Sequence, residues 1–162
     1  IYSLWLKQIV FADILTISSL FVIRAVSGAY VIGVWLSPWL ILCPFFLALF
    51  LTIGKRHSDL MLLKEKASQT RKVLKEYTDL TNPLMLIATT LLIICYALYS
   101  FFSQNPSLVY TTPLALFVIF RYFYLIRSGS KVARHPEKVF KDLPMVIGMI
   151  LLVLISGLLI YW

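Results

Sequence analysis

Long runs without a charged side chain are the feature of this sequence that most constrains its fold. Residues 25–54, 80–120 and 143–162 carry no charge, and these runs contain 30, 41 and 20 residues. A transmembrane helix needs about 20 predominantly apolar residues. The 41-residue run is therefore long enough for two helices, and its polar segment at residues 103–107, which contains a proline, predicts a turn between them.

The runs predict an all-α, multi-pass transmembrane bundle. Hydrophobic residues make up 60% of the chain and charged residues 14%, compared with about 45–50% and about 25% in soluble domains. This composition excludes an ordinary cytosolic enzyme, a disordered tail and a secreted disulfide scaffold. Ser37 followed by Pro38 is a typical helix start. We expect five spans, at residues 8–32, 38–54, 83–102, 109–126 and 143–161.

The basic residues lie almost entirely on one side of this predicted topology. That side receives Lys7, the segment 55–80 and the loop 127–142, which together hold 13 of the 15 lysines and arginines. Cytoplasmic loops carry such an excess of lysine and arginine. We therefore expect a protein of the inner cell membrane whose basic side faces the cytoplasm. The membrane topology explains the net charge of +8, so we expect no nucleic acid as a partner.

The segment that leaves the second predicted span is the strongest candidate for a site. Lys55 and Asp59 are four residues apart and Arg56 and Asp59 three apart, so on a helix the three side chains converge on one patch. Two cations and a carboxylate suit a phosphorylated substrate held partly through Mg²⁺, which takes oxygen ligands. The alternative is structural: a Lys-Arg pair commonly follows a span, and such an ion pair is routine on any helix.

The segment that follows predicts an amphipathic basic helix on the cytoplasmic face. Basic residues occupy much of its polar side, which is suited to anionic lipid headgroups or to substrate phosphate. The headgroup interpretation is the simpler one for any single lysine. The apolar or small residues that form its stripe are Leu60, Leu63, Ala67, Thr70, Leu74 and Tyr77.

Three charges fall inside predicted spans: Asp13, Arg24 and Arg121. Each costs about 2.5–3.5 kcal/mol at the centre of a membrane helix, so partners on other spans are expected. Asp13 and Lys7 lie near the cytoplasmic end and can reach the same phosphate as Lys55. Arg121, followed by three aromatic residues, is typical of an interfacial belt whose arginine extends toward the headgroups.

The cysteines and histidines carry no metal-site pattern. Cys43 and Cys95 lie in apolar runs and are interpreted as small core residues rather than a redox pair. His57 and His135 have no second ligand at metal-binding spacing.

An ordered set of motifs runs along almost the whole chain. The set comprises Tyr2-Ser3-x-x-Leu6-Lys7, Asp13, Phe21-Val22-Ile23-Arg24-Ala25 with Gly28, Leu36-Ser37-Pro38-Trp39, Gly54-Lys55-Arg56-x-x-Asp59-Leu60, Thr70-Arg71-Lys72-Val73-Leu74-x-x-Tyr77, Arg121-Tyr122 and Pro136-Glu137-Lys138-Val139-x-Lys141-Asp142-x-Pro144. In this order the motifs resemble the UbiA superfamily of intramembrane prenyltransferases, and most closely the branch that makes decaprenyl-phosphate phosphoribose.

The resemblance implies a nine-helix fold of which residues 1–162, a single transmembrane domain, supply the fifth to ninth helices. It implies a cavity open to the cytoplasm and two acidic motifs that hold Mg²⁺ and a diphosphate. The first motif, of the Asn-Asp-x-x-Asp type, is absent here. The second maps to Lys55, Arg56 and Asp59, although the branch usually has glutamate in place of Asp59.

The resemblance also implies a reaction, the transfer of 5-phosphoribose from phosphoribosyl pyrophosphate to a polyprenyl phosphate. The expected partners are these two substrates, membrane lipid and a second copy of the chain. The residue roles that we predict are catalysis by Lys7, Asp13, Lys55 and Arg56, metal binding by Asp59, and substrate binding by Lys7, Arg24, Lys55, Arg56, Arg71, Lys72 and Tyr77.

Two other functions stay open. One is a UbiA-type prenyltransferase that uses a prenyl diphosphate donor and an aromatic acceptor, although such enzymes tend to carry several aspartates in the second motif. The other is a non-catalytic subunit of a membrane transporter or assembly, which predicts no dependence on divalent cations.

Overall fold

The computed structural model describes residues 10–31, 33, 37–66, 71–128 and 141–161, and this part of the chain is helical with short connections and no strand. All but one of the elements are α-helices; η2 is a 3₁₀ helix. In chain order they are α1 (Val10–Val31), α2 (Pro38–Lys66), α3 (Arg71–Phe101), η2 (Pro106–Thr111), α4 (Thr112–Arg127) and α6 (Leu143–Tyr161).

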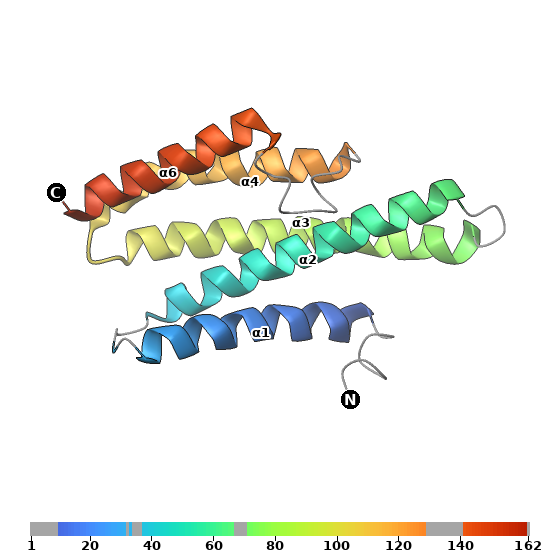
Figure 1. Ribbon diagram of the computed structural model, residues 1–162, viewed down its shortest axis with the longest axis horizontal. Helices are drawn as coiled ribbons and strands as arrows, with labels where there is room; N and C mark the ends of the chain where they lie inside the picture. Colours follow the sequence, from blue (N-terminus) through green and yellow to red (C-terminus); the bar gives the residue numbers. More distant parts are fainter. Residues whose placement is uncertain (1–9, 32, 34–36, 67–70, 129–140, 162) are drawn as a thin grey trace.

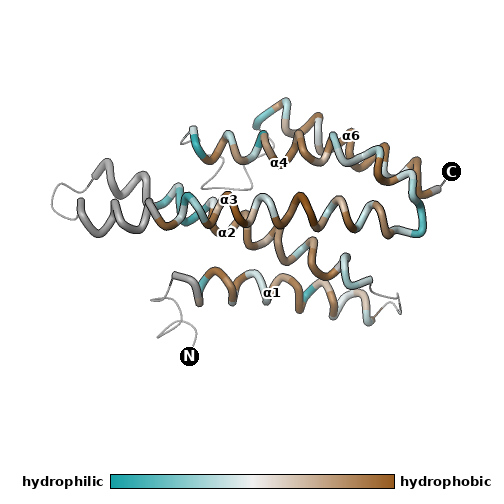
Figure 2. The backbone as a smooth tube through the Cα atoms, turned by 180° about the vertical axis from the view of Figure 1, so that it is seen from behind, coloured by the Kyte–Doolittle hydropathy of each residue, from teal (hydrophilic) through white to brown (hydrophobic). Residues whose placement is uncertain are grey.

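Five segments of these helices are long and apolar enough to cross a membrane, which confirms the all-α, five-span prediction and makes this a multi-pass membrane protein. Apolar residues occupy the long middle parts of the helices, while hydrophilic residues concentrate toward the helix ends (Figure 2). The candidate spans are Ala12–Val31, Ile41–Asp59, Leu80–Phe101, Pro106–Arg127 and Leu143–Ile160.

α2 lies between α1 and α3 and contacts both, while α4 and α6 pack on each other on the other side of α3 (Figure 1). The shared core includes Phe50 of α2, Met85 of α3, and Tyr122 and Ile126 of α4, each no more than 2% exposed. The start of α1, the end of α2, the start of α3, the end of α4 and the start of α6 all lie toward one side (Figure 1). This alternation brings the basic segments of the sequence to that side.

α2 and α3 are longer than the sequence pattern predicted. They contain 29 and 31 residues, which corresponds to about 43 and 46 Å of helix, whereas the hydrocarbon core of a bilayer is about 30 Å thick. The two helices extend together past the other helices (Figure 1). The separate amphipathic helix expected over residues 60–77 is therefore wrong in form, because residues 60–66 continue α2 and residues 71–77 begin α3.

The turn between the third and fourth spans lies where the sequence places it. α3 ends at Phe101 and η2 begins at Pro106, whose fixed backbone angle suits the first position of a helix. The fourth span begins with this 3₁₀ segment rather than with an α-helix at residue 109.

Candidate functional site

The candidate site lies where α2 leaves the bundle, next to Gly54. A Cβ atom at this position would lie 2.5 Å from the Cδ1 atom and 3.2 Å from the Cγ1 atom of the Ile126 side chain on α4, so a larger residue would require that side chain to move. Glycine therefore suits the close packing of α2 on α4 here. Lys55, Arg56 and Asp59 follow directly after this contact on α2.

Arg56 crosses to α1 and forms an ion pair with Asp13, 43 residues earlier in the chain. Its Nε atom donates to Asp13 Oδ2 at 2.9 Å, and Nη2 donates to the same oxygen. The Asp13 side chain is 3% exposed and that of Arg56 is 36% exposed. The buried carboxylate thus orients a partly exposed guanidinium, and a hydrogen-bonded partner offsets the cost of burying the charge.

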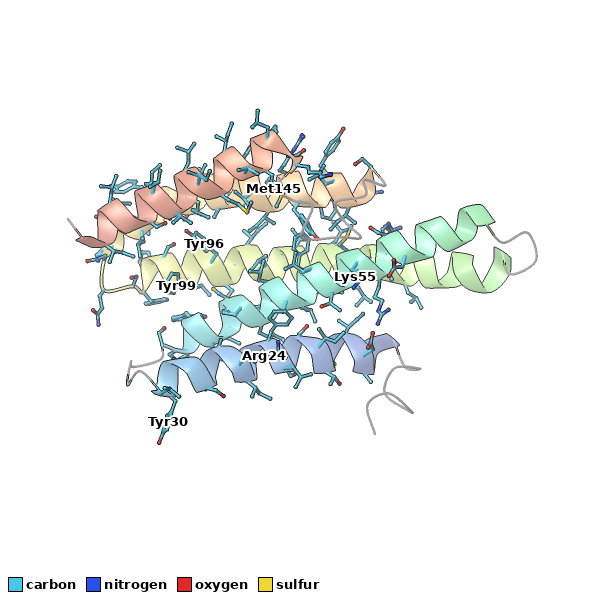
Figure 3. All side chains as sticks on the ribbon, in the orientation of Figure 1. Arg24, Tyr30, Lys55, Tyr96, Tyr99 and Met145 are labelled. Carbon is cyan, nitrogen blue, oxygen red and sulfur yellow. The ribbon has the colours of Figure 1, made fainter. Side chains whose placement is uncertain are left out.

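Lys55 and Asp59 lie one turn apart on the same helix. Lys55 is exposed and Asp59 is partly buried, and Figure 3 shows Lys55 on α2 toward the end where α2 and α3 extend together. Residues four apart on a helix share one face. The structure therefore places an ammonium group and a carboxylate on one face of α2, whereas Arg56 turns toward Asp13 of α1 and away from this patch.

Two neighbours of this patch are buried between helices. His57 is 3% exposed, and its Nδ1 atom hydrogen-bonds with Thr81 Oγ1 of α3 at 3.0 Å. Ser58 is 5% exposed, and among the described residues its hydroxyl has no hydrogen-bond partner. His57 thus joins α2 to α3.

The contacts of Arg121 differ from those predicted for an arginine of an interfacial belt that extends toward the headgroups. Its Nε atom donates to Asp142 Oδ1 at 3.1 Å and its Nη2 atom donates to Asp142 Oδ2 at 2.8 Å, so the pair is forked. The guanidinium carbon also lies 5.5 Å from the centroid of the Tyr124 ring. Tyr122, expected in the same belt, is 2% exposed because the ring packs against Phe50 at an edge-to-face centroid distance of 5.5 Å.

The sequence analysis named Asp142 within a motif but did not predict its ion pair with Arg121. Besides binding Arg121, its Oδ1 atom accepts a hydrogen bond of 3.0 Å from the backbone N–H of Met145, so it is the N-cap of α6. The hydrogen bond from Arg121 lowers the pKa of Asp142. Its signal in the sequence is an aspartate two residues before Pro144, a usual helix start.

Arg24 and the two cysteines, which the sequence places in apolar segments, lie in different surroundings. Arg24 is exposed, and within the described part of the chain no ion pair includes it. Figure 3 shows Arg24 on α1. Cys43 and Cys95 are free thiols whose sulfur atoms lie 3.2 Å apart, so these residues join α2 to α3. They were predicted as core residues, and Cys95 is 3% exposed.

Several residues named in the sequence analysis have side chains outside the part of the chain that the structure describes. Lys7 is one of them, as is His135, which is predicted to be a poor metal ligand. Arg71, Lys72 and Tyr77 belong to the first two turns of α3, but their side chains lie outside the described part. The site roles of Lys7, Arg71, Lys72 and Tyr77 stay predictions.

The donor set next to Lys55 fits Mg²⁺ held mainly by substrate. Within the residues that the structure describes, no three His, Cys, Asp or Glu side chains are grouped as a metal site. Mg²⁺ usually binds through one or two carboxylates together with substrate phosphates and water. Asp59 can supply one carboxylate, and its neighbour Lys55 suits the phosphates that complete such a site.

The sequence is similar to proteins named decaprenyl-phosphate phosphoribosyltransferase, while no family model matches it. The relative from Mycolicibacterium smegmatis is 28% identical over 149 residues, covering 85% of this chain and 47% of the relative. One from Mycobacterium tuberculosis is 29% identical over 143 residues, with 85% and 46% covered. One from Corynebacterium glutamicum is 33% identical over 101 residues, with 62% and 30% covered.

The chain thus spans about half the length of the first two relatives, and the match includes most of its own length. The resemblance inferred from the ordered motifs is confirmed by these matches. Over 85% of its length this membrane protein is a homologue of the decaprenyl-phosphate phosphoribosyltransferases, which supports its place in that branch of the UbiA superfamily.

Proposed function

We propose that this protein transfers 5-phosphoribose from phosphoribosyl pyrophosphate to a polyprenyl phosphate. The observation that carries the proposal is the similarity to relatives of that name over 85% of the chain. The exposed cation Lys55, the carboxylate Asp59 and the oriented guanidinium Arg56 support it, because they cluster at one end of a membrane-spanning helix. A soluble phosphorylated donor and a membrane-bound phosphorylated acceptor meet at such a place.

In the reaction, the bond from the anomeric carbon of ribose to the pyrophosphate oxygen breaks. A new bond forms from that carbon to an oxygen of the lipid phosphate, and pyrophosphate leaves. Positive charge develops on the ribose and negative charge on the leaving group, so preorganised cations stabilise the transition state.

Each residue of the cluster has a role in this scheme. Lys55 contacts a phosphate group of the donor or of the acceptor, and Arg56 donates its remaining N–H groups to the diphosphate while Asp13 holds its orientation. Lys7 is a further phosphate contact. Arg24 contacts an anionic group of a substrate, and Arg71, Lys72 and Tyr77 contribute to substrate binding. Asp59 would hold Mg²⁺, which when bound supplies positive charge next to the diphosphate.

The number of cations favours this donor over a prenyl diphosphate. Phosphoribosyl pyrophosphate has a diphosphate and a separate 5-phosphate, whereas a prenyl diphosphate has one anionic group. Lysine and arginine form charge-assisted hydrogen bonds with each. A cluster with Lys55 and Arg56, near the basic ends of α2 and α3, suits the donor with two anionic groups.

We further propose that this end of the bundle faces the cytoplasm in the inner membrane, since the predicted basic segments gather there. Exposed Lys141 lies at this end and exposed Gln104 at the opposite turn. Single cysteines at these positions, in a cysteine-free background, should react with an impermeant thiol reagent from opposite sides of sealed membranes. Reaction of both from the same side would contradict the topology.

The activity is tested in membranes that contain the protein at its full natural length. Radiolabelled phosphoribosyl pyrophosphate, Mg²⁺ and a polyprenyl phosphate should yield a labelled lipid, and chelation of divalent cations should abolish the product. If the membranes instead prenylate an aromatic acid from a prenyl diphosphate, the donor assignment is wrong. If they do neither, a non-catalytic membrane subunit becomes the better interpretation.

A further inference from the structure

Two thiols from distant parts of the chain meet between α2 and α3. Cys43 and Cys95 are 52 residues apart in the sequence, and their Sγ atoms lie 3.2 Å apart. Both cysteines are free. The apolar runs that contain them predict two core residues, and only the packing of α2 on α3 brings the sulfur atoms together. The structure therefore contains a pair of adjacent thiols that no pattern in the sequence predicts.

The contacts of Cys95 hold its sulfur atom against α2. Besides the contact with Cys43, its Sγ atom lies 4.0 Å from the backbone carbonyl oxygen of Trp39, one turn before Cys43. The S–S length of a disulfide is about 2.0 Å, so the two sulfur atoms would have to approach each other by about 1.2 Å to form one. Side-chain rotation can supply an approach of this size.

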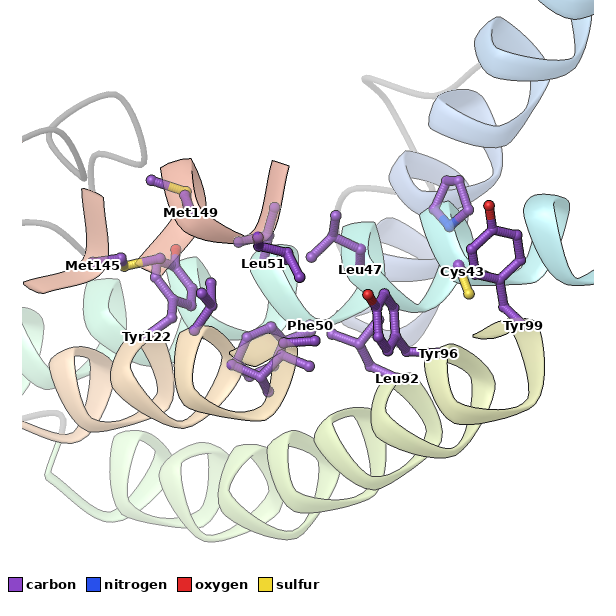
Figure 4. Close-up of a pocket in the computed structure, with 15 residues that line it drawn as sticks. Cys43, Leu47, Phe50, Leu51, Leu92, Tyr96, Tyr99, Tyr122, Met145 and Met149 are labelled. Atoms are coloured by element: carbon purple, nitrogen blue, oxygen red, sulfur yellow. The ribbon is translucent and has the colours of Figure 1, made fainter. Parts of the chain in front are cut away.

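The two thiols differ in how a small molecule reaches them. Cys43 is partly exposed and lines a cavity of about 590 Å³ between α2, α3, α4 and α6 (Figure 4). Apart from this thiol and three tyrosine hydroxyls, the side chains that line the cavity are apolar. Cys95 does not line the cavity and is 3% exposed. A small apolar reagent therefore reaches Cys43 first, with Cys95 directly behind it.

This pair suits redox chemistry better than metal binding. Structural zinc takes four ligands, and within the described part of the chain no three His, Cys, Asp or Glu side chains are grouped as a metal site. Oxidation needs only the two sulfur atoms. A reachable cysteine next to a second, resolving cysteine is the usual arrangement of a thiol pair that oxidises reversibly.

We infer that Cys43 and Cys95 are a site of reversible oxidation, at which a hydroperoxide in the membrane converts the two thiols to a disulfide between α2 and α3. First the Cys43 sulfur attacks a peroxide oxygen and the O–O bond breaks. The hydroperoxide is reduced to an alcohol, which takes the thiol proton, and Cys43 becomes a sulfenic acid. The Cys95 sulfur then attacks the Cys43 sulfur, the S–S bond forms, and the hydroxyl group leaves with the Cys95 proton as water.

The inference does not rest on the proposed reaction. Cys43 lies about 18 Å from Lys55 along α2, so the thiol pair is separate from the patch at the other end of this helix. A bond between Cys43 and Cys95 closes the chain that runs through the end of α2 and the start of α3 into a loop. Such a loop restricts the unfolded state, so the oxidised protein should be the more stable form.

The first test detects the disulfide directly in the protein at its full natural length. Membranes are treated with cumene hydroperoxide, free thiols are blocked with a permeant maleimide, and the protein is digested and analysed by mass spectrometry without reduction. Most of the protein should yield a peptide that links Cys43 to Cys95, and dithiothreitol should remove the link. Absence of this peptide would overturn the inference.

A matched control tests whether the contact between the sulfur atoms is required. In the double variant Cys95→Ser, Ile94→Cys, the second thiol moves by one position to a residue that is 50% exposed and points about 100° away around α3. Cumene hydroperoxide should then link less than about one tenth as much protein as in the wild type. Equal linkage would show that the contact is not needed and would overturn the inference.

The order of the two steps is tested with single variants. After the hydroperoxide treatment, dimedone, which reacts with sulfenic acids, should label Cys43 in Cys95→Ser at least about tenfold more than Cys95 in Cys43→Ser. Equal labelling would contradict the proposed order. Cumene hydroperoxide should also raise the unfolding temperature of the wild-type protein in detergent by at least about 4 °C and leave that of Cys43→Ser unchanged. The same rise in Cys43→Ser would contradict a bond between these two residues.

Discussion

Two ion pairs within the described part of the chain join helices through an arginine and an aspartate, and they differ in geometry. Arg121 binds both carboxylate oxygens of Asp142, which also caps α6, so this pair closes the junction between α4 and α6. Arg56 binds one oxygen of Asp13 through Nε and Nη2, and its side chain is 36% exposed. The first pair is a structural link, whereas the second holds an arginine that solvent can reach.

The surroundings of the two pairs strengthen this contrast. In the Asp13–Arg56 pair, Arg56 directly follows Lys55 on α2, at the end of the helix where we propose that substrate phosphates bind. The Arg121–Asp142 pair is covered partly by the Tyr124 ring. Asp13 and Arg121, two of the three charged residues inside predicted spans, thus have ion-pair partners, and the surroundings of each pair distinguish a structural link from a candidate site.

The largest expected effect is that of Asp59→Asn in the complete enzyme. Loss of a carboxylate that holds Mg²⁺ should lower turnover at least about a hundredfold, because it removes several kcal/mol of transition-state stabilisation. Thermal unfolding in detergent should stay unchanged. The control is Asp142→Asn, which should lower the unfolding temperature and change turnover by no more than a few-fold. Normal turnover of Asp59→Asn at saturating Mg²⁺ would show that Asp59 does not hold the metal.

The second largest effect distinguishes the contributions of Arg56 and Asp13 to the free energy of unfolding. Arg56→Gln removes a charged hydrogen-bond partner of the buried Asp13 carboxylate and should reduce the free energy of unfolding by about 1–3 kcal/mol. Asp13→Asn should cost less, because it removes the buried charge itself and leaves Arg56 partly exposed to solvent. Unfolding of both variants in the same detergent measures the difference. A larger loss in Asp13→Asn would show that the carboxylate is stabilised mainly by other groups.

The third effect is a pH dependence specific to the α4–α6 junction. Arg121 lowers the pKa of Asp142 below its ordinary value. The pair therefore contributes stability that is fully present above the ordinary carboxyl pKa of about 3.9 and is lost as pH falls through the lowered value. The wild-type protein should lose stability over this acidic range, and Asp142→Asn should lack that component of the loss. Identical acid unfolding of the two proteins would contradict the assignment.

The smallest expected effect concerns Tyr122 on α4 and tests whether its hydroxyl has a role in turnover. The Tyr122 hydroxyl is buried without a hydrogen-bond partner among the described residues. Tyr122→Phe keeps the ring against Phe50 and should stabilise the fold by about 1 kcal/mol, with turnover unchanged. Tyr96→Phe, which removes the hydrogen bond to Thr111, should have the opposite sign. A strong loss of turnover in Tyr122→Phe would give that hydroxyl a substrate contact.

Hydropathy alone located the membrane helices and the side on which the basic residues gather. It worked because no backbone group can stay unpaired in hydrocarbon, so an apolar run of sufficient length has to be helical. The prediction from the sequence pattern was wrong at residues 60–77. An amphipathic stripe is compatible both with a helix that lies on the membrane surface and with a helix that continues a span. In the structure, residues 60–66 continue α2 and residues 71–77 begin α3.

The sequence by itself therefore determined the five spans, the basic face and the likeness to the phosphoribosyltransferases, since each depends on local composition or on the order of motifs. Only the tertiary structure decided that Arg56 meets Asp13, that Arg121 meets Asp142 and that an apolar cavity lies between α2, α3, α4 and α6 (Figure 4). These contacts depend on how each helix is rotated about its axis. That rotation follows from close packing between distant residues, such as Gly54 against Ile126, which no pattern within a single helix contains.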